Sequence, residues 1–163
     1  MATGPVHEAL AAVELVDHHC HGVVTEDLDR AAFESLLTEG DVWPGSGISP
    51  FDSPVGIAVR RYCAPLLDLE RHAPADEYLA RRAELGPHEV NRRFLAAAGT
   101  GVLCVDTGFA PHEITSPAEL AEVAGAVAHE VVRLEAVAES VAGRGVEPDG
   151  YADAFRAAAL DAV

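Results

Sequence analysis

The 163-residue chain is strongly acidic, with 27 Asp and Glu residues against 11 basic residues and a formal net charge of −16. A surface with this charge repels phosphate groups, so the sequence argues against nucleic-acid binding and against docking on an anionic membrane. The length allows one domain. Three widely spaced cysteines give no disulfide framework, and neither a signal peptide nor an apolar run of membrane-spanning length is visible. We therefore expect a cytoplasmic protein whose partner is a small-molecule substrate.

The first two thirds of the chain predict a helix, a short strand and then a long helical stretch. Residues 4–13 have apolar positions at helical spacing. Residues 14–21 form a short apolar run that becomes polar before Gly22, as in a strand that emerges from a core. Residues 24–98 contain helical and loop patterns without a convincing strand, and Pro87 opens the last of these helices. A connection of this length in a compact domain is typically functional.

The remaining third alternates strands with helices. Residues 102–109 predict a second buried strand, and residues 116–119 read Ser-Pro-Ala-Glu, a capping box that begins a helix. Residues 129–139 fit either a third strand or a continued helix, and residues 149–162 predict a last helix. Strands that alternate with helices favour an α/β fold with a parallel sheet, either open or closed as a barrel.

The segment Asp17-His18-His19-Cys20-His21 carries the clearest chemistry in the sequence. Side chains alternate between the two faces of a strand, so His19 and His21 are predicted to share one face with Asp17, opposite His18 and Cys20. Two imidazoles on one rigid element can bind the same divalent cation, and zinc is the first expectation, with manganese or iron as alternatives. A catalytic zinc site needs at least three protein ligands, so other strands must contribute.

Two other interpretations of the histidines remain open. They can be a structural or surface cluster in a non-catalytic, truncated acidic domain. They can also belong to a complete small helical metalloprotein that binds its ion through His18, His19 and His21 together with carboxylates of its helices.

The run Leu15-Val16-Asp17-His18-His19-Cys20-His21 resembles the D-x-H-x-H motif on the first strand of the amidohydrolase superfamily. The branch it resembles most is the amidohydrolase-2 type, including the domains fused to glutamine synthetase-like proteins. Weaker similarity extends to residues 49–63, 105–109 and 132–135. The resemblance implies the first two or three strands of a partial (β/α)8 TIM barrel, with a long helical insertion at about 24–98 after the first strand. It implies His19 and His21 as metal ligands of a hydrolase that activates water to cleave an amide or a related C–N or C–O bond.

The chain departs from that family in ways that bear on its activity. Family members complete their site with a Lys or Glu, two further His and an Asp on later strands, whereas this chain has no Lys and at most three predicted strands. Residues 1–163 are therefore interpreted as the N-terminal part of one barrel domain of a longer enzyme, inactive alone. Some amidohydrolase-2 relatives decarboxylate their substrates, which leaves that reaction as an alternative. Uncovered apolar surface predicts that the chain associates, as a homo-oligomer or less specifically.

Five further residues are weaker candidates. Asp106, with Thr107 beside it, ends the second strand, where catalytic groups gather in α/β folds. Arg133 and Glu135 would share a face with His129 if residues 129–139 form a strand, and they would then bind a substrate carboxylate. Trp43 lies in a predicted loop, residues 40–53, within the long stretch after the first strand, and is a candidate for shaping the substrate pocket. For each of these residues a structural role, such as a loop cap or an internal ion pair, is the competing interpretation.

Overall fold

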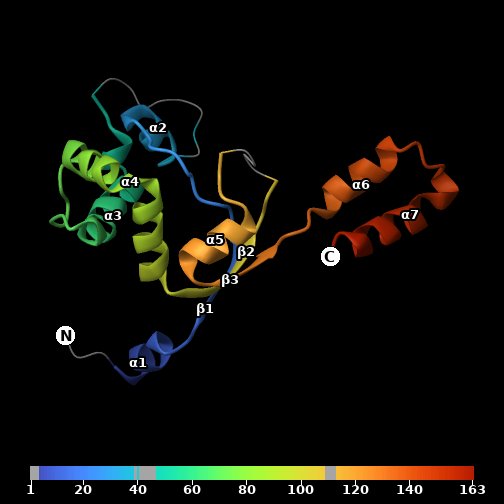
Figure 1. Ribbon diagram of the computed structural model, residues 1–163, viewed down its shortest axis with the longest axis horizontal. Coiled ribbons are helices and arrows are strands. Elements are labelled where there is room, and N and C mark those ends of the chain that lie inside the picture. The colour runs from blue at the N-terminus through green and yellow to red at the C-terminus, as the bar shows by residue number, and fades with distance from the viewer. Residues whose placement is uncertain (1–3, 39, 41–46, 109–112) are drawn as a thin grey trace.

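The computed structural model of the chain describes all residues except 1–3, 39, 41–46 and 109–112. Its centre is a parallel sheet of three strands, β1 (Leu15–Cys20), β2 (Thr100–Val105) and β3 (Val127–Glu130), in the order β1-β2-β3 (Figure 1). All three strands end on the same edge of the sheet because they are parallel. That edge is where polar residues of different strands meet.

One face of the sheet is covered by helix α5 (Pro117–Ala124). The helix begins at Ser116, whose hydroxyl accepts from the amide of Glu119 while the Glu119 carboxylate accepts from the amide of Ser116, so the expected capping box is present. Leu120 of α5 packs against Leu103 and Val105 of β2 and forms with them the small core of the sheet. This core fixes the face on which β2 presents its alternate residues.

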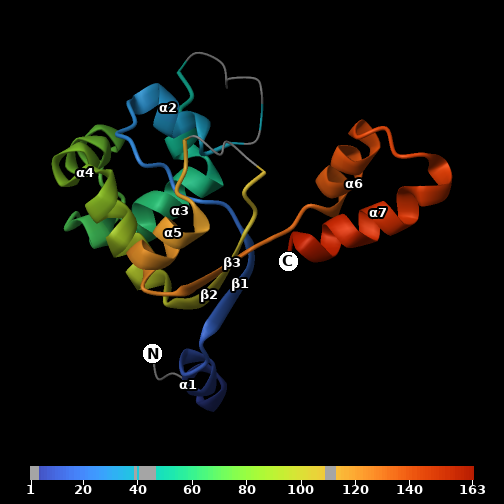
Figure 2. The ribbon, with the colours of Figure 1, turned by 45° about the vertical axis from the view of Figure 1, so that its right-hand side comes forward.

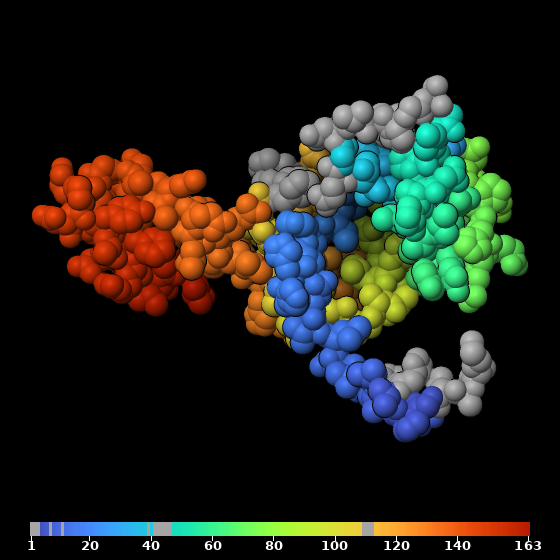
Figure 3. Space-filling model, turned by 180° about the vertical axis from the view of Figure 1, so that it is seen from behind, coloured from blue at the N-terminus to red at the C-terminus, as the bar shows by residue number. Residues whose placement is uncertain are grey.

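The other face of the sheet carries a row of three valines. Val16 pairs with Val102, and Val102 pairs with Val127, so the three side chains lie side by side on one face. Val16 is 59% exposed and Val127 is 55% exposed. Figure 3 shows β1 lying open at the surface on this side of the molecule. We call this set the valine row.

The chain between β1 and β2 folds into a helical subdomain with its own core. Its elements are α2 (Arg30–Ser35), the short 3-10 helices η1 (Pro50–Asp52) and η2 (Ala64–Leu67), α3 (Pro54–Tyr62) and α4 (Ala75–Ala98). Phe33, Phe51 and Tyr78 meet in its centre, with the Phe33 and Phe51 rings stacked at 5.3 Å between centroids. Helix α4 bends where Gly86 takes a positive φ of 75° before Pro87, the position at which the sequence predicts one helix to end and the next to begin.

Three helices stand away from the sheet. Helix α1 (Pro5–Ala11) precedes β1, and α6 (Leu134–Gly143) and α7 (Pro148–Asp161) form a hairpin beyond β3 (Figure 2). The Tyr151 hydroxyl donates to the carbonyl of Ala138 at 3.0 Å and links the two helices of the hairpin. No helix in the described part of the chain combines the length and apolar composition that crossing a bilayer requires.

The expectation of a partial (β/α)8 barrel is wrong: the described strands form an open three-stranded parallel sheet, with β1 and β3 as its edges. Alternating strands and helices are common to open sheets and barrels, and closure depends on strand tilt and stagger, which the hydrophobic pattern does not encode. The third strand also differs from the interpretation of residues 129–139. It spans Val127–Glu130, and a helix already begins at Leu134.

Candidate metal centre

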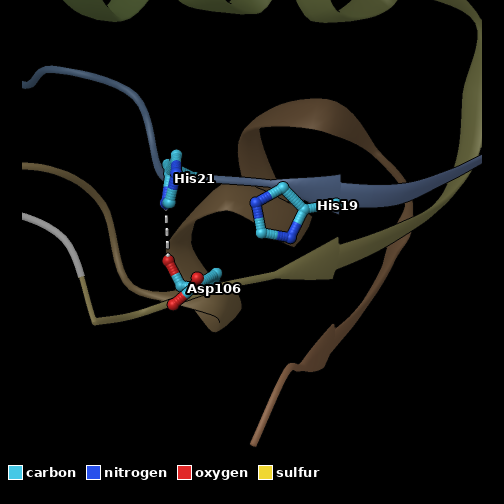
Figure 4. Close-up of side chains that lie close together, drawn as sticks. All are labelled: His19, His21 and Asp106. Atoms are coloured by element: carbon cyan, nitrogen blue, oxygen red, sulfur yellow. Dashed lines mark hydrogen bonds between the residues drawn. The ribbon is translucent and has the colours of Figure 1, made fainter. Parts of the chain in front are cut away.

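His19, His21 and Asp106 come together at the carboxyl ends of β1 and β2 (Figure 4). Each offers one ligand atom, and the three atoms lie within 4.8 Å of one another. The His19 and His21 rings are 5.4 Å apart between centroids and nearly perpendicular. Among the described residues, this is the group of His, Cys, Asp and Glu side chains with the spacing to hold a metal ion.

A register shift in β1 helps to gather the two histidines. Asp17 pairs with Leu103 and Cys20 pairs with Val105, so β1 advances three residues while β2 advances two. The Asp17 carboxylate accepts from the backbone amide of His19 at 3.2 Å. Cys20 packs against the core on the α5 side. Asp17 and Cys20 therefore pair with two residues of the same face of β2, so strict alternation does not hold through this segment, and Asp17 is outside the three-residue cluster.

His21 is oriented by the main chain of the neighbouring strand. Its Nδ1 lies 2.9 Å from the backbone carbonyl oxygen of Asp106. A carbonyl oxygen only accepts, so Nδ1 carries the proton and Nε2 is the ring nitrogen with the lone pair. A carbonyl acceptor on the second nitrogen is the usual companion of a metal-binding histidine. The amide of Asp106 also donates to the carbonyl of Cys20 at 2.8 Å, which holds the two strand ends together.

Asp106 is buried, at 5% exposure, and is held by a charged fork. Arg133 donates through Nε to Oδ1 and through Nη2 to Oδ2, each at 2.8 Å, and the amide of Gly108 donates to Oδ1 at 2.8 Å. The hydrogen bonds from Arg133, and then that from Gly108, lower the pKa of Asp106 to about 2. Asp106 is therefore an anion at neutral pH and is better suited to bind a cation than to accept a proton.

Neighbouring residues complete the edge of the sheet around Asp106. The Thr107 hydroxyl donates to the Glu130 carboxylate at 2.6 Å, which links the ends of β2 and β3. Gly22 lies so close to the loop before α5 that a Cβ there would come within 2.1 Å of the Thr115 carbonyl oxygen. A cavity of about 140 Å³ opens beside Asp106, between Gly22 and the residues that lead into α5. A small molecule bound there would lie next to the three-residue cluster.

The candidate residues from the sequence are distributed unevenly around this centre. His19, His21 and Asp106 lie together. Arg133, the residue directly before α6, contacts Asp106. Glu135 is exposed in the first turn of α6. Trp43 lies outside the described residues. His18 is exposed and outside the cluster, so the described structure does not assemble a site from all three histidines of the motif.

Two features of the site are missed by reasoning from the sequence. The sequence predicts Asp106 as a catalytic residue but does not place it beside the two histidines, because that proximity depends on which strands are neighbours. Gly108 is not predicted at all, although a Cβ at this residue would lie 2.3 Å from Nε of Arg133. The signal that points to both is the Asp-Thr-Gly sequence directly after a buried strand.

The donor set fits a divalent cation. Two imidazoles and one carboxylate are the protein ligands of one common class of catalytic zinc site, which keeps a further position for water or substrate. His19 is exposed, so the cluster is open to solvent on one side. The ionised state of Asp106 and the fixed tautomer of His21 also favour the binding of a divalent cation.

Comparison with known proteins supports the fold. The chain is similar to the crystal structure of a protein from Lactobacillus casei ATCC 334 described as a candidate metal-dependent hydrolase, with 24% sequence identity and a TM-score of 0.58. The match covers 91% of this chain and 39% of the other, so the chain spans well under half the length of that protein. No protein-family model matches the sequence. No curated protein matches it either.

Proposed function

We propose that this chain carries the metal centre of a metal-dependent hydrolase of the amidohydrolase type. The observation that carries the proposal is the convergence of His19, His21 and Asp106 at the ends of two parallel strands. The similar Lactobacillus casei protein is described as a candidate metal-dependent hydrolase, and the first-strand motif of this chain resembles that of the amidohydrolases. Zinc is the proposed ion, with manganese and iron as alternatives that the same ligands accept.

The roles of the residues follow from their contacts. A divalent cation at this position supplies Lewis acidity, which makes water a stronger nucleophile at neutral pH and polarises a scissile carbonyl group. His19 on β1 and His21 directly after it would hold the cation, and the backbone carbonyl of Asp106 keeps the His21 ring in a single orientation. Asp106 contributes a negative charge that the pair with Arg133 keeps ionised.

We propose Arg133 for substrate binding from its contact with Asp106, and two further residues from the sequence alone. Glu135 and Trp43 remain proposed contacts from the sequence. Arg133 has Nε and Nη2 on Asp106, so it would reach a substrate carboxylate through Nη1. The substrate proposed is a small molecule with an amide or a related bond.

The proposal is tested by metal-dependent turnover. The protein is expressed from its full reading frame, loaded with Zn²⁺, Mn²⁺ or Co²⁺ and assayed against amide and ester substrates, with CO2 release measured in parallel. His129 lies on β3 outside the cluster, which makes His129→Ala the matched control for His19→Ala. Hydrolysis that a chelator and His19→Ala abolish, and that His129→Ala retains, supports the proposal.

Other results of this assay contradict the proposal. CO2 release without hydrolysis identifies a decarboxylase instead. Tight metal binding by the protein of the full reading frame, without turnover of any substrate, assigns the centre a non-catalytic role. Turnover that survives both chelation and His19→Ala places the chemistry elsewhere.

A further inference from the structure

The interaction between Arg133 and Asp106 occupies most of the carboxylate. A carboxylate has about four lone-pair positions, two on each oxygen. Oδ1 accepts from Nε of Arg133 and from the amide of Gly108, and both bonds are 2.8 Å long. Oδ2 accepts from Nη2 of Arg133 at 2.8 Å. The two donors therefore take both positions on Oδ1 and one of the two on Oδ2.

The backbone around Asp106 and Arg133 positions the Arg133 guanidinium beside the Asp106 carboxylate. The amide of Val131 donates to the carbonyl of Val105 at 2.8 Å, which extends the contact between β2 and β3 beyond the last paired residues. Arg133 follows two residues later. A Cβ on Gly108 would lie 2.3 Å from Nε and 2.5 Å from Cζ of Arg133. Glycine at this position leaves the space that the guanidinium fills.

We propose that Arg133 is a positioning residue that confines Asp106 to a single ligating oxygen, Oδ2, and thereby sets which cation the centre prefers. The inference rests on the proposed metal centre. An arginine fork with two parallel hydrogen bonds fixes the plane of the carboxylate, which a lysine ammonium, as a point charge, does not. One oxygen and two imidazoles suit Zn²⁺, whereas a second oxygen ligand from the same carboxylate favours Mn²⁺, which prefers oxygen donors.

The experiment compares Zn²⁺ and Mn²⁺ affinities, and the visible absorption of bound Co²⁺, in the unmodified chain, three variants and one control variant. Arg133→Met removes the fork. Gly108→Ala displaces the guanidinium and retains its charge. Arg133→Lys retains the charge without the fork. Arg156→Met is the matched control, because Arg156 forms an exposed pair with Asp153 on α7. Circular dichroism and urea unfolding establish that each variant is folded.

Arg133→Met and Gly108→Ala are each expected to lower the ratio of Zn²⁺ to Mn²⁺ affinity by about tenfold, the lower end of the usual effect of partners that hold a ligand. The absorption per bound Co²⁺ is expected to weaken, because a further oxygen raises the coordination number. Arg133→Lys should behave like Arg133→Met, and Arg156→Met like the unmodified chain.

Several results overturn the inference. An unchanged affinity ratio and Co²⁺ spectrum in both Arg133→Met and Gly108→Ala would show that the fork does not select the cation. Full retention of the ratio in Arg133→Lys would show that charge alone acts. Equal loss of both affinities would assign Arg133 to general stability of the site. If the unmodified chain binds none of the three ions, the proposed metal centre itself is wrong. This outcome is distinct from the results above, which concern only the role of Arg133.

Discussion

The helical subdomain between β1 and β2 and the sheet that carries the candidate metal centre are packed very differently. Among the residues that the structure describes, the core of the subdomain contains eight buried apolar residues, including Phe33, Phe51 and Tyr78, whereas the core of the sheet contains three, Leu103, Val105 and Leu120. On its other face the sheet leaves Val16 and Val127 more than half exposed. The residues with metal chemistry thus lie on the less buried part of the molecule, and most of the apolar core lies in the subdomain.

This difference suggests that the subdomain provides most of the stability and that the sheet edge provides the candidate metal centre. Burial of apolar surface is the main source of folding free energy, so the subdomain should dominate the stability of the chain. The sheet edge instead concentrates charged and polar groups, whose desolvation would be costly unless they are paired.

Truncation of the aromatic core should have the largest effect on stability. Phe51 is 1% exposed and its ring contacts those of Phe33 and Tyr78. Phe51→Ala is expected to lower the free energy of unfolding by about 3–5 kcal/mol. Val16→Ala on the exposed valine row should change it by at most about 0.5 kcal/mol. Urea unfolding measures both, and equal losses would contradict the division between the two regions.

A side chain at Gly22 should disturb the edge of the sheet at the metal centre. The Cβ would meet the Thr115 carbonyl oxygen at 2.1 Å, and main-chain atoms move less easily than side chains. Gly22→Ala is expected to cost about 1–3 kcal/mol in unfolding free energy. Gly143→Ala is the matched control, because no atom lies within 4 Å of the Cβ position there. A loss of stability in the control but not in Gly22→Ala would be inconsistent with the close approach at Gly22.

The valine row should promote self-association at high protein concentration. Its exposed apolar side chains and the open strand edges offer a surface to another copy, although the net charge of −16 opposes the contact. The double change Val16→Thr and Val127→Thr is expected to raise the dissociation constant of the associated form by about tenfold. Sedimentation velocity over a range of concentrations measures this, and an unmodified chain that stays monomeric throughout would refute it.

The smallest effect concerns an exposed ion-pair network on α4. Hydrogen bonds from Arg92 and Arg93 lower the pKa of Glu89 from 4.5 to about 2. Because the pKa is lower in the folded state, the stabilisation is present above about pH 4.5 and is lost as the pH falls toward about 2. The difference in urea midpoint between the unmodified chain and Glu89→Gln should therefore shrink over this interval. A difference that grows as the pH falls would contradict the prediction that ionised Glu89 stabilises the folded chain.

The local features of the fold are largely predictable from the sequence. Ser53-Pro54 and Ser116-Pro117 begin helices because their hydroxyls and proline rings satisfy the first turn, and α3 and α5 start there. The pair His19 and His21 is found because the two imidazoles are two residues apart at the end of a predicted strand. These signals are contained in a few neighbouring residues.

Features that depend on distant residues were not predictable in the same way. The fork between Arg133 and Asp106 joins residues 27 positions apart, and it forms because β3 ends at Glu130 and not further along the chain. Whether the sheet closes into a barrel depends on the tilt and stagger of its strands, and the pattern of apolar residues is silent on both. The register shift in β1 likewise reflects its pairing with β2.

The central claim, a metal centre formed by His19, His21 and Asp106, is tested most directly by calorimetric titration of the chain with Zn²⁺. We expect one bound ion per chain. Affinity should fall by about a hundredfold or more in His19→Ala and His21→Ala, less in Asp106→Asn, and remain unchanged in His129→Ala. Absence of stoichiometric binding, or equal affinity in the His19→Ala and His129→Ala variants, would contradict it.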